Sequence, residues 1–190
     1  GGLTNELWRL DVASGLVPSW SLRAPGGPAP SPRASPAAVV VRGTLYVHGG
    51  EAPGSNETTD ALLHSLPTSR GGKWNASAPP GGPGARAGHT MASVGLSHAV
   101  LSGGYPHSNT TWLLNAAGAY PSWVDITPIT GPAPAVRGGS AAALSLQHLR
   151  FGGSFEGGGR SAALTSVSAM TMLAPFSALR VPVWADVSEA

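Results

Sequence analysis

The chain contains 190 residues and a charged fraction of only 11%, against roughly 25% in an ordinary soluble domain. The apolar fraction of 42% is enough for a hydrophobic core, and no apolar run approaches the roughly 18 residues of a membrane-spanning helix, so general disorder and a spanning helix in this segment are both excluded. The chain has no cysteine, which excludes disulfides and thiolate chemistry, and its net charge of +2 comes from dispersed cations, which disfavours nucleic-acid binding.

The first complete unit along the chain is expected to be a sheet of four short strands. Residues 35–41 form an apolar strand that ends at the tight-turn pair Arg42–Gly43, and residues 44–48 form a second strand that Gly49 and Gly50 end. Residues 60–66 are expected to form a third strand, and Trp74 to open the fourth. A Pro/Gly tract over residues 78–85 closes the unit. No helical periodicity persists for more than two turns, so the sequence predicts an all-β chain.

The same markers recur in a fixed order at intervals of about fifty residues. Successive marker arginines are 53 and 51 positions apart, and the second glycines of successive diglycines are 54 and 49 positions apart. Each diglycine is followed by a loop, a short apolar run and a tryptophan. The markers are Arg33, Arg86 and Arg137; Gly49, Gly50, Gly103, Gly104, Gly152 and Gly153; and Trp20, Trp74, Trp123 and Trp184.

This order of arginine, two strands, diglycine, loop, third strand and tryptophan resembles the kelch repeat, whose period is about 50 residues. The resemblance covers about residues 5–187 and weakens after Gly153. It implies blades of a β-propeller, with the indoles filling the space between adjacent sheets. The expected fold is an all-β propeller segment of about three and a half four-stranded kelch blades, antiparallel within each blade. Residues 1–32 would be the second half of one blade with its following loop, and residues 33–85, 86–136 and 137–190 one blade each, the last degenerate.

Propellers close with about four to eight blades, and an open arc would expose two apolar sheet faces. We therefore expect this segment to be part of a longer polypeptide, with the remaining blades supplied by the same parent chain.

Three sequons, at Asn56, Asn75 and Asn109, are candidate N-glycosylation sites. Asn56 and Asn109 occupy equivalent loops after their diglycines, where a glycosylation enzyme could reach them. Asn75 is weaker because it follows Trp74, which we expect to be packed. The alternative is that these are turn-forming asparagines in a chain rich in Ser and Thr. The sequons favour an extracellular or lumenal location, with a cytoplasmic one as the alternative.

The six histidines do not have the spacing of a metal site, and His89 is expected to be structural. The recurring marker arginines could form a ring of anion contacts around the channel, but their presence in every unit favours a structural role, capping carbonyls or pairing between blades. We expect no catalytic residue, metal or cofactor in this segment.

Long loops between second and third strands, and between blades, are expected to form the recognition face for a protein partner. The side chains there that can contribute most are Glu51, Tyr105, Glu156 and Arg160. The sequence thus predicts a non-catalytic protein-interaction scaffold. Two alternatives stay open: an enzyme of the galactose-oxidase type with its active site in blades absent here, and a glycan-binding module using Tyr105 and Trp112, although burial of Trp112 is expected.

Overall fold

The computed structural model describes residues 2–12, 17–54, 60–106, 109–127, 140–144, 147–154, 160–168 and 185–186, the last four ranges by their backbone. The described residues form β-strands joined by turns and loops, and contain no helix long and apolar enough to cross a membrane. The strands are β1 (Leu7–Asp11), β2 (Ser19–Arg23), β3 (Ala37–Val41), β4 (Thr44–His48), β5 (Leu63–Pro67), β6 (Asn75–Ser77), β7 (Thr90–Val94), β8 (His98–Ser102), β9 (Thr111–Asn115), β10 (Ser122–Asp125), β11 (Ser140–Leu144), β12 (Gln147–Ser154), β13 (Arg160–Ser168) and β14 (Ala185–Asp186).

The strands make one two-stranded hairpin and three four-stranded antiparallel sheets. The hairpin is β1–β2, and the sheets have the orders β3-β4-β5-β6, β7-β8-β9-β10 and β11-β12-β13-β14. Each sheet is a simple meander, because every strand pairs with its neighbour in the sequence. In the first sheet, Val41 pairs with Thr44 across the turn at Arg42 and Gly43, which have φ values of 50° and 70°. Positive φ at both central residues defines the turn type that suits the twist of a hairpin.

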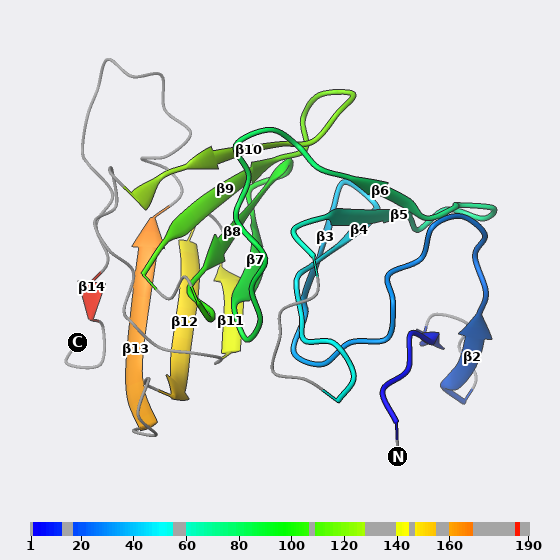
Figure 1. The fold of residues 1–190 in the computed structure, drawn as a ribbon, viewed down its shortest axis with the longest axis horizontal. Coiled ribbons are helices and arrows are strands. Elements are labelled where there is room, and N and C mark those ends of the chain that lie inside the picture. Colours follow the sequence, from blue (N-terminus) through cyan, green and yellow to red (C-terminus); the bar gives the residue numbers. More distant parts are fainter. Residues whose placement is uncertain are drawn as a thin grey trace.

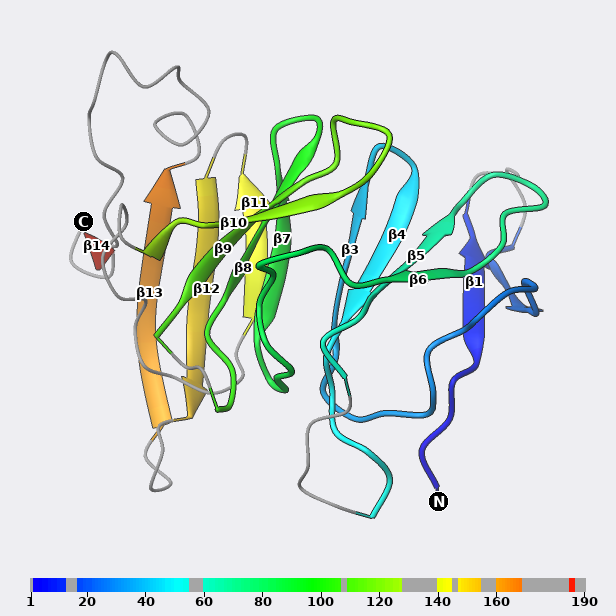
Figure 2. The ribbon, with the colours of Figure 1, turned by 45° about the horizontal axis from the view of Figure 1, so that its top comes forward.

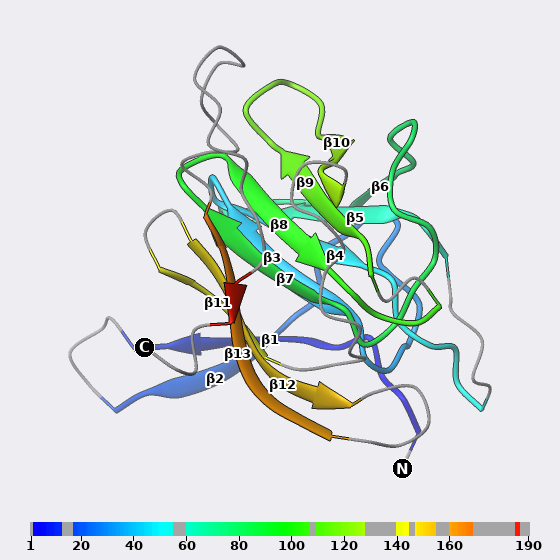
Figure 3. The same cartoon turned by 90° about the vertical axis from the view of Figure 1, so that its left-hand side faces the viewer.

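The sheets stand face to face along the chain, from the hairpin on one side to β11–β13 on the other (Figures 1 and 2). The first strands of successive sheets, β3, β7 and β11, lie next to one another. Viewed from the β13 side, the sheets lie one behind another (Figure 3). This arrangement is an arc of a β-propeller: three four-stranded blades, preceded by the outer half of a fourth.

Adjacent sheets are held together by apolar cores in which two marker tryptophans take part. Trp123 belongs to the core between the sheets β3–β6 and β7–β10, with Val39 and Tyr46 on one side and Met91 and Leu101 on the other. Trp74 packs with Val47, Leu66 and, from the hairpin, Leu7. Each indole therefore faces the preceding sheet and is almost fully buried, with 8% of Trp74 and 7% of Trp123 exposed.

The expectation that Trp20 fills an inter-sheet space is wrong for the described residues, because 64% of Trp20 is exposed. Its face of the hairpin also carries Trp8, Leu10 and Leu22, which pair with one another and with Trp20 across the strands. All four are exposed. The physical reason is that no described sheet lies on that side of the hairpin.

Four finer expectations also need correction. Trp74 precedes the fourth strand, which begins at Asn75, and the third strand is Leu63–Pro67 and so starts later than expected. In the last sheet β12 continues through Gly152 and Gly153 to Ser154, with a register shift between Phe151 and Gly153. Trp112 is only partly buried against the inter-sheet core.

Candidate functional site

Two of the marker arginines make the same contact within their own blades. Nη1 of Arg33 donates to the carbonyl oxygen of Gly49 at 2.8 Å, and Nη1 of Arg86 donates to that of Gly103 at 3.0 Å. The loop before the third strand supplies a second partner in each case: Asp60 for Arg33 at 3.2 Å and Thr110 for Arg86 at 2.9 Å. These two guanidiniums therefore fasten the diglycine and the following loop to the start of the sheet. Arg137 lies outside the described residues.

The diglycine of one sheet also meets the backbone of the next sheet. The Gly50 amide donates to the Arg86 carbonyl oxygen at 2.8 Å, and the Gly88 amide donates to the Ser35 carbonyl oxygen at 3.0 Å. A Cβ atom at Gly49 would lie 2.0 Å from the Arg86 carbonyl oxygen, and Gly49 has a φ of 64°. Close approach and positive φ together require glycine at this position.

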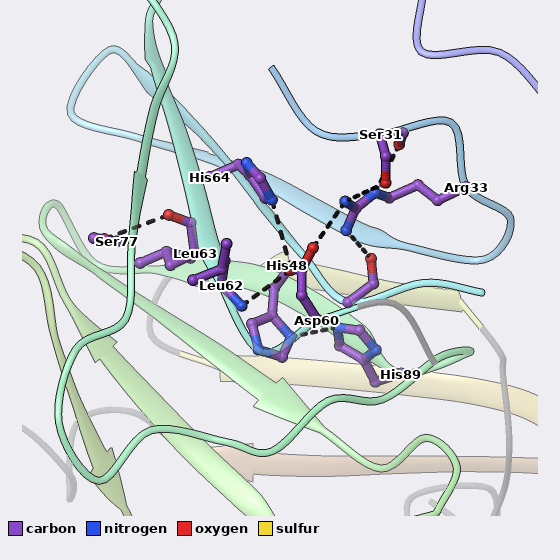
Figure 4. A network of polar contacts seen from close by, with 10 residues as sticks. Ser31, Arg33, His48, Asp60, Leu62, Leu63, His64, Ser77 and His89 are labelled. Atoms are coloured by element: carbon purple, nitrogen blue, oxygen red, sulfur yellow. Dashed lines mark hydrogen bonds and ion pairs between the residues drawn. The ribbon is translucent and has the colours of Figure 1, made fainter. Parts of the chain in front are cut away.

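Two histidines meet at this junction between sheets (Figure 4). Nδ1 of His48, the last residue of β4, lies 3.3 Å from Nε2 of His89, which precedes β7. Burial, followed by the nearby Arg86 cation, lowers the pKa of His48 to about 4. Burial, with His48 and Arg86, also holds the pKa of His89 well below its usual range. His89 is thus buried in the fold, as expected of a structural residue, but its Nδ1 has no hydrogen-bond partner.

A second polar group lies on the opposite face of the same sheet. Nε2 of His64 is 3.6 Å from Oδ1 of Asp60, whose other oxygen accepts from Arg33 (Figure 4). Burial lowers the pKa of His64, and Asp60 opposes that effect. Within the described part of the chain, no three His, Asp or Glu side chains are grouped so that they could hold a metal ion.

The predicted recognition residues that the structure describes lie at one end of adjacent sheets. Glu51 forms an isolated bridge with Ala34, and Tyr105 forms the equivalent bridge with Ala87 in the next sheet. Glu51 is partly buried, whereas Tyr105 is exposed. Of the other two, Arg160 begins β13 and Glu156 lies outside the described residues.

The sequons have different settings. Asn109 is exposed in the loop before β9, and Asn75 is exposed at the start of the edge strand β6. The Trp74 side chain is buried while that of Asn75 is not. The packing of Trp74 is therefore no argument against Asn75 as a glycosylation site. Asn56 lies outside the described residues, as does the marker Trp184.

A pocket of about 580 Å³ opens between the hairpin β1–β2 and the sheet β3–β6. Its apolar lining includes Leu7, Val40 and Leu45, and three cations lie around it: Arg9, Arg23 and Lys73. The pocket marks the place where the hairpin, with two strands instead of four, fails to cover its neighbour. Val40 on β3, which lines the pocket, is 52% exposed.

Sequence reasoning missed two features: the contact between His48 and His89, and the exposed apolar face of the hairpin. It treated His48 and His89 separately. His48 comes directly before one diglycine and His89 comes three residues after the next marker arginine, and these two positions meet where two blades pack together. It also overlooked that Trp8, Leu10 and Leu22 share a face with Trp20, which the two-residue alternation in both strands indicates.

The comparisons with known proteins agree with this architecture. No protein-family model matches the chain. The chain is 31% identical over 138 residues to the serine/threonine-protein phosphatase BSL2 of Arabidopsis thaliana, a match that covers 70% of this chain and 13% of that protein. The solved structure of YjhT is similar in fold, with a TM-score of 0.69 at 16% identity over 98% of this chain and 60% of YjhT. The chain is therefore a β-propeller segment, and it spans only a small part of its curated relative.

Proposed function

We propose that this chain is part of a kelch-type propeller in a larger protein and acts there as a non-catalytic scaffold that binds a protein partner. The observation that carries the proposal is that the sheets are fixed by repeated arginine contacts while the loops at one end of them vary. Each marker arginine described fixes its diglycine and next loop, while the loops that start at Glu51 and Tyr105 differ in length and sequence. Recognition commonly resides in such loops.

We propose that the remaining blades come from the same parent chain. The exposed face formed by Trp8, Leu10, Trp20 and Leu22 supports this, because the equivalent tryptophans Trp74 and Trp123 are covered by a preceding sheet. A contiguous apolar surface of this kind is unusual on a soluble protein. A further sheet packed on it would cover the indole of Trp20 as the other two are covered.

The partner surface can be tested by crosslinking from single positions in the full-length protein. A photoreactive phenylalanine at Tyr105 should capture a specific protein, and the same probe at Leu96 should not. Leu96 is a matched control because it is also exposed but lies in the turn between β7 and β8, at the opposite end of that sheet. The captured protein should bind Glu51→Arg and Tyr105→Ala variants at least tenfold more weakly. Capture at Leu96 alone, or unchanged binding to both variants, would overturn the proposal.

An extracellular or lumenal glycoprotein is the second part of the proposal. The exposure of Asn109 and Asn75 supports it, because a glycosylation enzyme needs an accessible asparagine. Mass spectrometry of natively purified protein should find glycan at Asn109. Unmodified asparagine at all three sequons would contradict this location.

The enzymatic alternative has its own measurement. Stoichiometric copper or iron in the purified full-length protein would replace the scaffold proposal with a metalloenzyme whose site lies in other blades.

A further inference from the structure

The His48–His89 pair joins two sheets whose strands do not pair with each other. His48 comes from the end of β4 and His89 from the residue before β7, and their rings meet edge to face with centroids 5.2 Å apart. His48 is fully buried and His89 is 5% exposed. In Figure 4 the two rings point toward one another and a single contact joins them.

A hydrogen bond between two imidazoles needs one proton between two nitrogens. In the neutral pair, one ring donates an N–H and the other accepts with its unprotonated nitrogen. The donating ring can take up a first proton on its other nitrogen, which keeps the bond but leaves a positive charge in the buried junction without a hydrogen-bond partner. A second proton, on the accepting ring, leaves two N–H groups and two positive charges facing each other across 3.3 Å, and the bond is lost. The first proton therefore weakens the contact between the sheets, and full protonation makes it repulsive.

The charged groups around the pair do not compensate for such a charge. The strongest charge effect on His48 comes from the guanidinium of Arg86, itself buried, and Arg33 adds a second positive charge. Asp60 is the carboxylate that favours a charge on His48, but it lies 3.2 Å from Arg33 and is already paired with it. On the side of β10, the pair meets the uncharged indole of Trp123, 5.9 Å from His48.

We propose that the neutral His48–His89 pair is an acid-sensitive latch that holds the sheet β3–β6 against the sheet β7–β10, and that protonation of the pair opens this seam. The two backbone hydrogen bonds that cross the seam, from Gly50 to Arg86 and from Gly88 to Ser35, would be lost together with it.

The direction of the pH effect follows from the lowered pKa values. His48 has a pKa of about 4 in the folded protein and 6.5 in the unfolded chain. As pH falls below 6.5, the unfolded or opened form takes up protons first, so the closed form loses stability down to about pH 4. This gap corresponds to a roughly 300-fold fall in the closing equilibrium constant. Above pH 6.5, the pair is neutral in both forms and has no effect on the pH dependence.

The next seam provides an internal contrast. The residue that precedes its diglycine is Ser102, whose hydroxyl lies 3.0 Å from that of Thr90, and the residue equivalent to His89 is Ser140. Neither serine titrates in this range. The histidine pair is therefore not repeated at the next junction of the arc.

Hydrogen exchange of the full chain, followed residue by residue between pH 7.5 and 4, tests this inference. The protection factors of the Gly50 and Gly88 amides should fall at least 30-fold over that range, while those of Ala87 and Tyr105, which bond to each other within one blade, should fall less than threefold. In His48→Gln, the seam amides should lose the part of this pH dependence that His48 supplies, and in the double variant His48→Gln/His89→Gln they should lose all of it. An unchanged profile in His48→Gln, or an equal loss at Ala87, would overturn the latch.

A second measurement does not depend on how the variant folds. The ring carbons of His48 and His89 in the unmutated chain should titrate below pH 5, at the lower end of the range over which Gly50 loses protection. Titration of either ring near pH 6.5 while the seam amides stay protected would also overturn the latch.

Discussion

Three marker tryptophans occupy one repeat position in two environments, which makes them a controlled comparison. Trp74 and Trp123 are almost fully buried, whereas Trp20 is mostly exposed. A tryptophan side chain buries about 150–250 Å² in a core, and its truncation to alanine there costs about 3–5 kcal/mol. Trp20 buries about a third of its surface, so the proportionate cost is about 1–2 kcal/mol. Trp74→Ala and Trp123→Ala should therefore exceed Trp20→Ala by about 2–3 kcal/mol.

The assay is urea unfolding of this chain, followed by circular dichroism, with the three variants compared at one temperature. The comparison should then be repeated in the longer parent protein, where a preceding sheet would cover Trp20. There, the cost of Trp20→Ala should rise to that of Trp74→Ala. Equal costs in the isolated chain would refute the burial argument. A cost for Trp20→Ala that stays small in the parent protein would refute the proposed blade on that face.

Four further outcomes are expected. Gly49→Ala should destabilise the chain by at least about 2 kcal/mol more than Gly81→Ala in urea unfolding, because both glycines have φ near 65° but only at Gly49 would the new Cβ clash with a backbone carbonyl. Arg86→Lys should cost about 1.5–3 kcal/mol in the same assay, since an ammonium cannot keep the contacts of the buried guanidinium with Gly84, Gly103 and Thr110 together; a loss below about 0.5 kcal/mol would contradict this role. The free energy of unfolding should fall by about 2 kcal/mol between pH 7.5 and 5 from His48 alone, and thermal melts of His48→Gln should lack that part of the slope. Asn109→Gln should remove one glycan from secreted protein on a denaturing gel, and an unchanged mobility would show that this sequon is unused.

The sequence was sufficient to predict the blades, because the features that mark them depend on residues close together in the chain. A two-residue turn at Arg42–Gly43 and a diglycine with positive φ are encoded within a few residues. The alternation of buried and exposed residues in β3 is equally local, and so the strand and its inward face could be predicted.

Contacts between sheets were harder to predict, because they depend on register and on what lies opposite. His48 and His89 are 41 positions apart and meet only once both sheets are stacked. The exposure of Trp20 depends on a neighbour that is not among the described residues, and no pattern in its own strand reports that. The course of β12 through Gly152 and Gly153 shows that a glycine pair permits a strand end without enforcing one.

The arginine–diglycine contacts have a consequence for how the molecule comes apart. The guanidinium of Arg86 grips its own blade, while its backbone carbonyl accepts the amide of Gly50 from the blade before. Arg86 thus stabilises its own blade and also links that blade to the one before it. Above the acid range in which this junction opens, neighbouring blades should consequently unfold cooperatively, and a single blade should have little stability of its own.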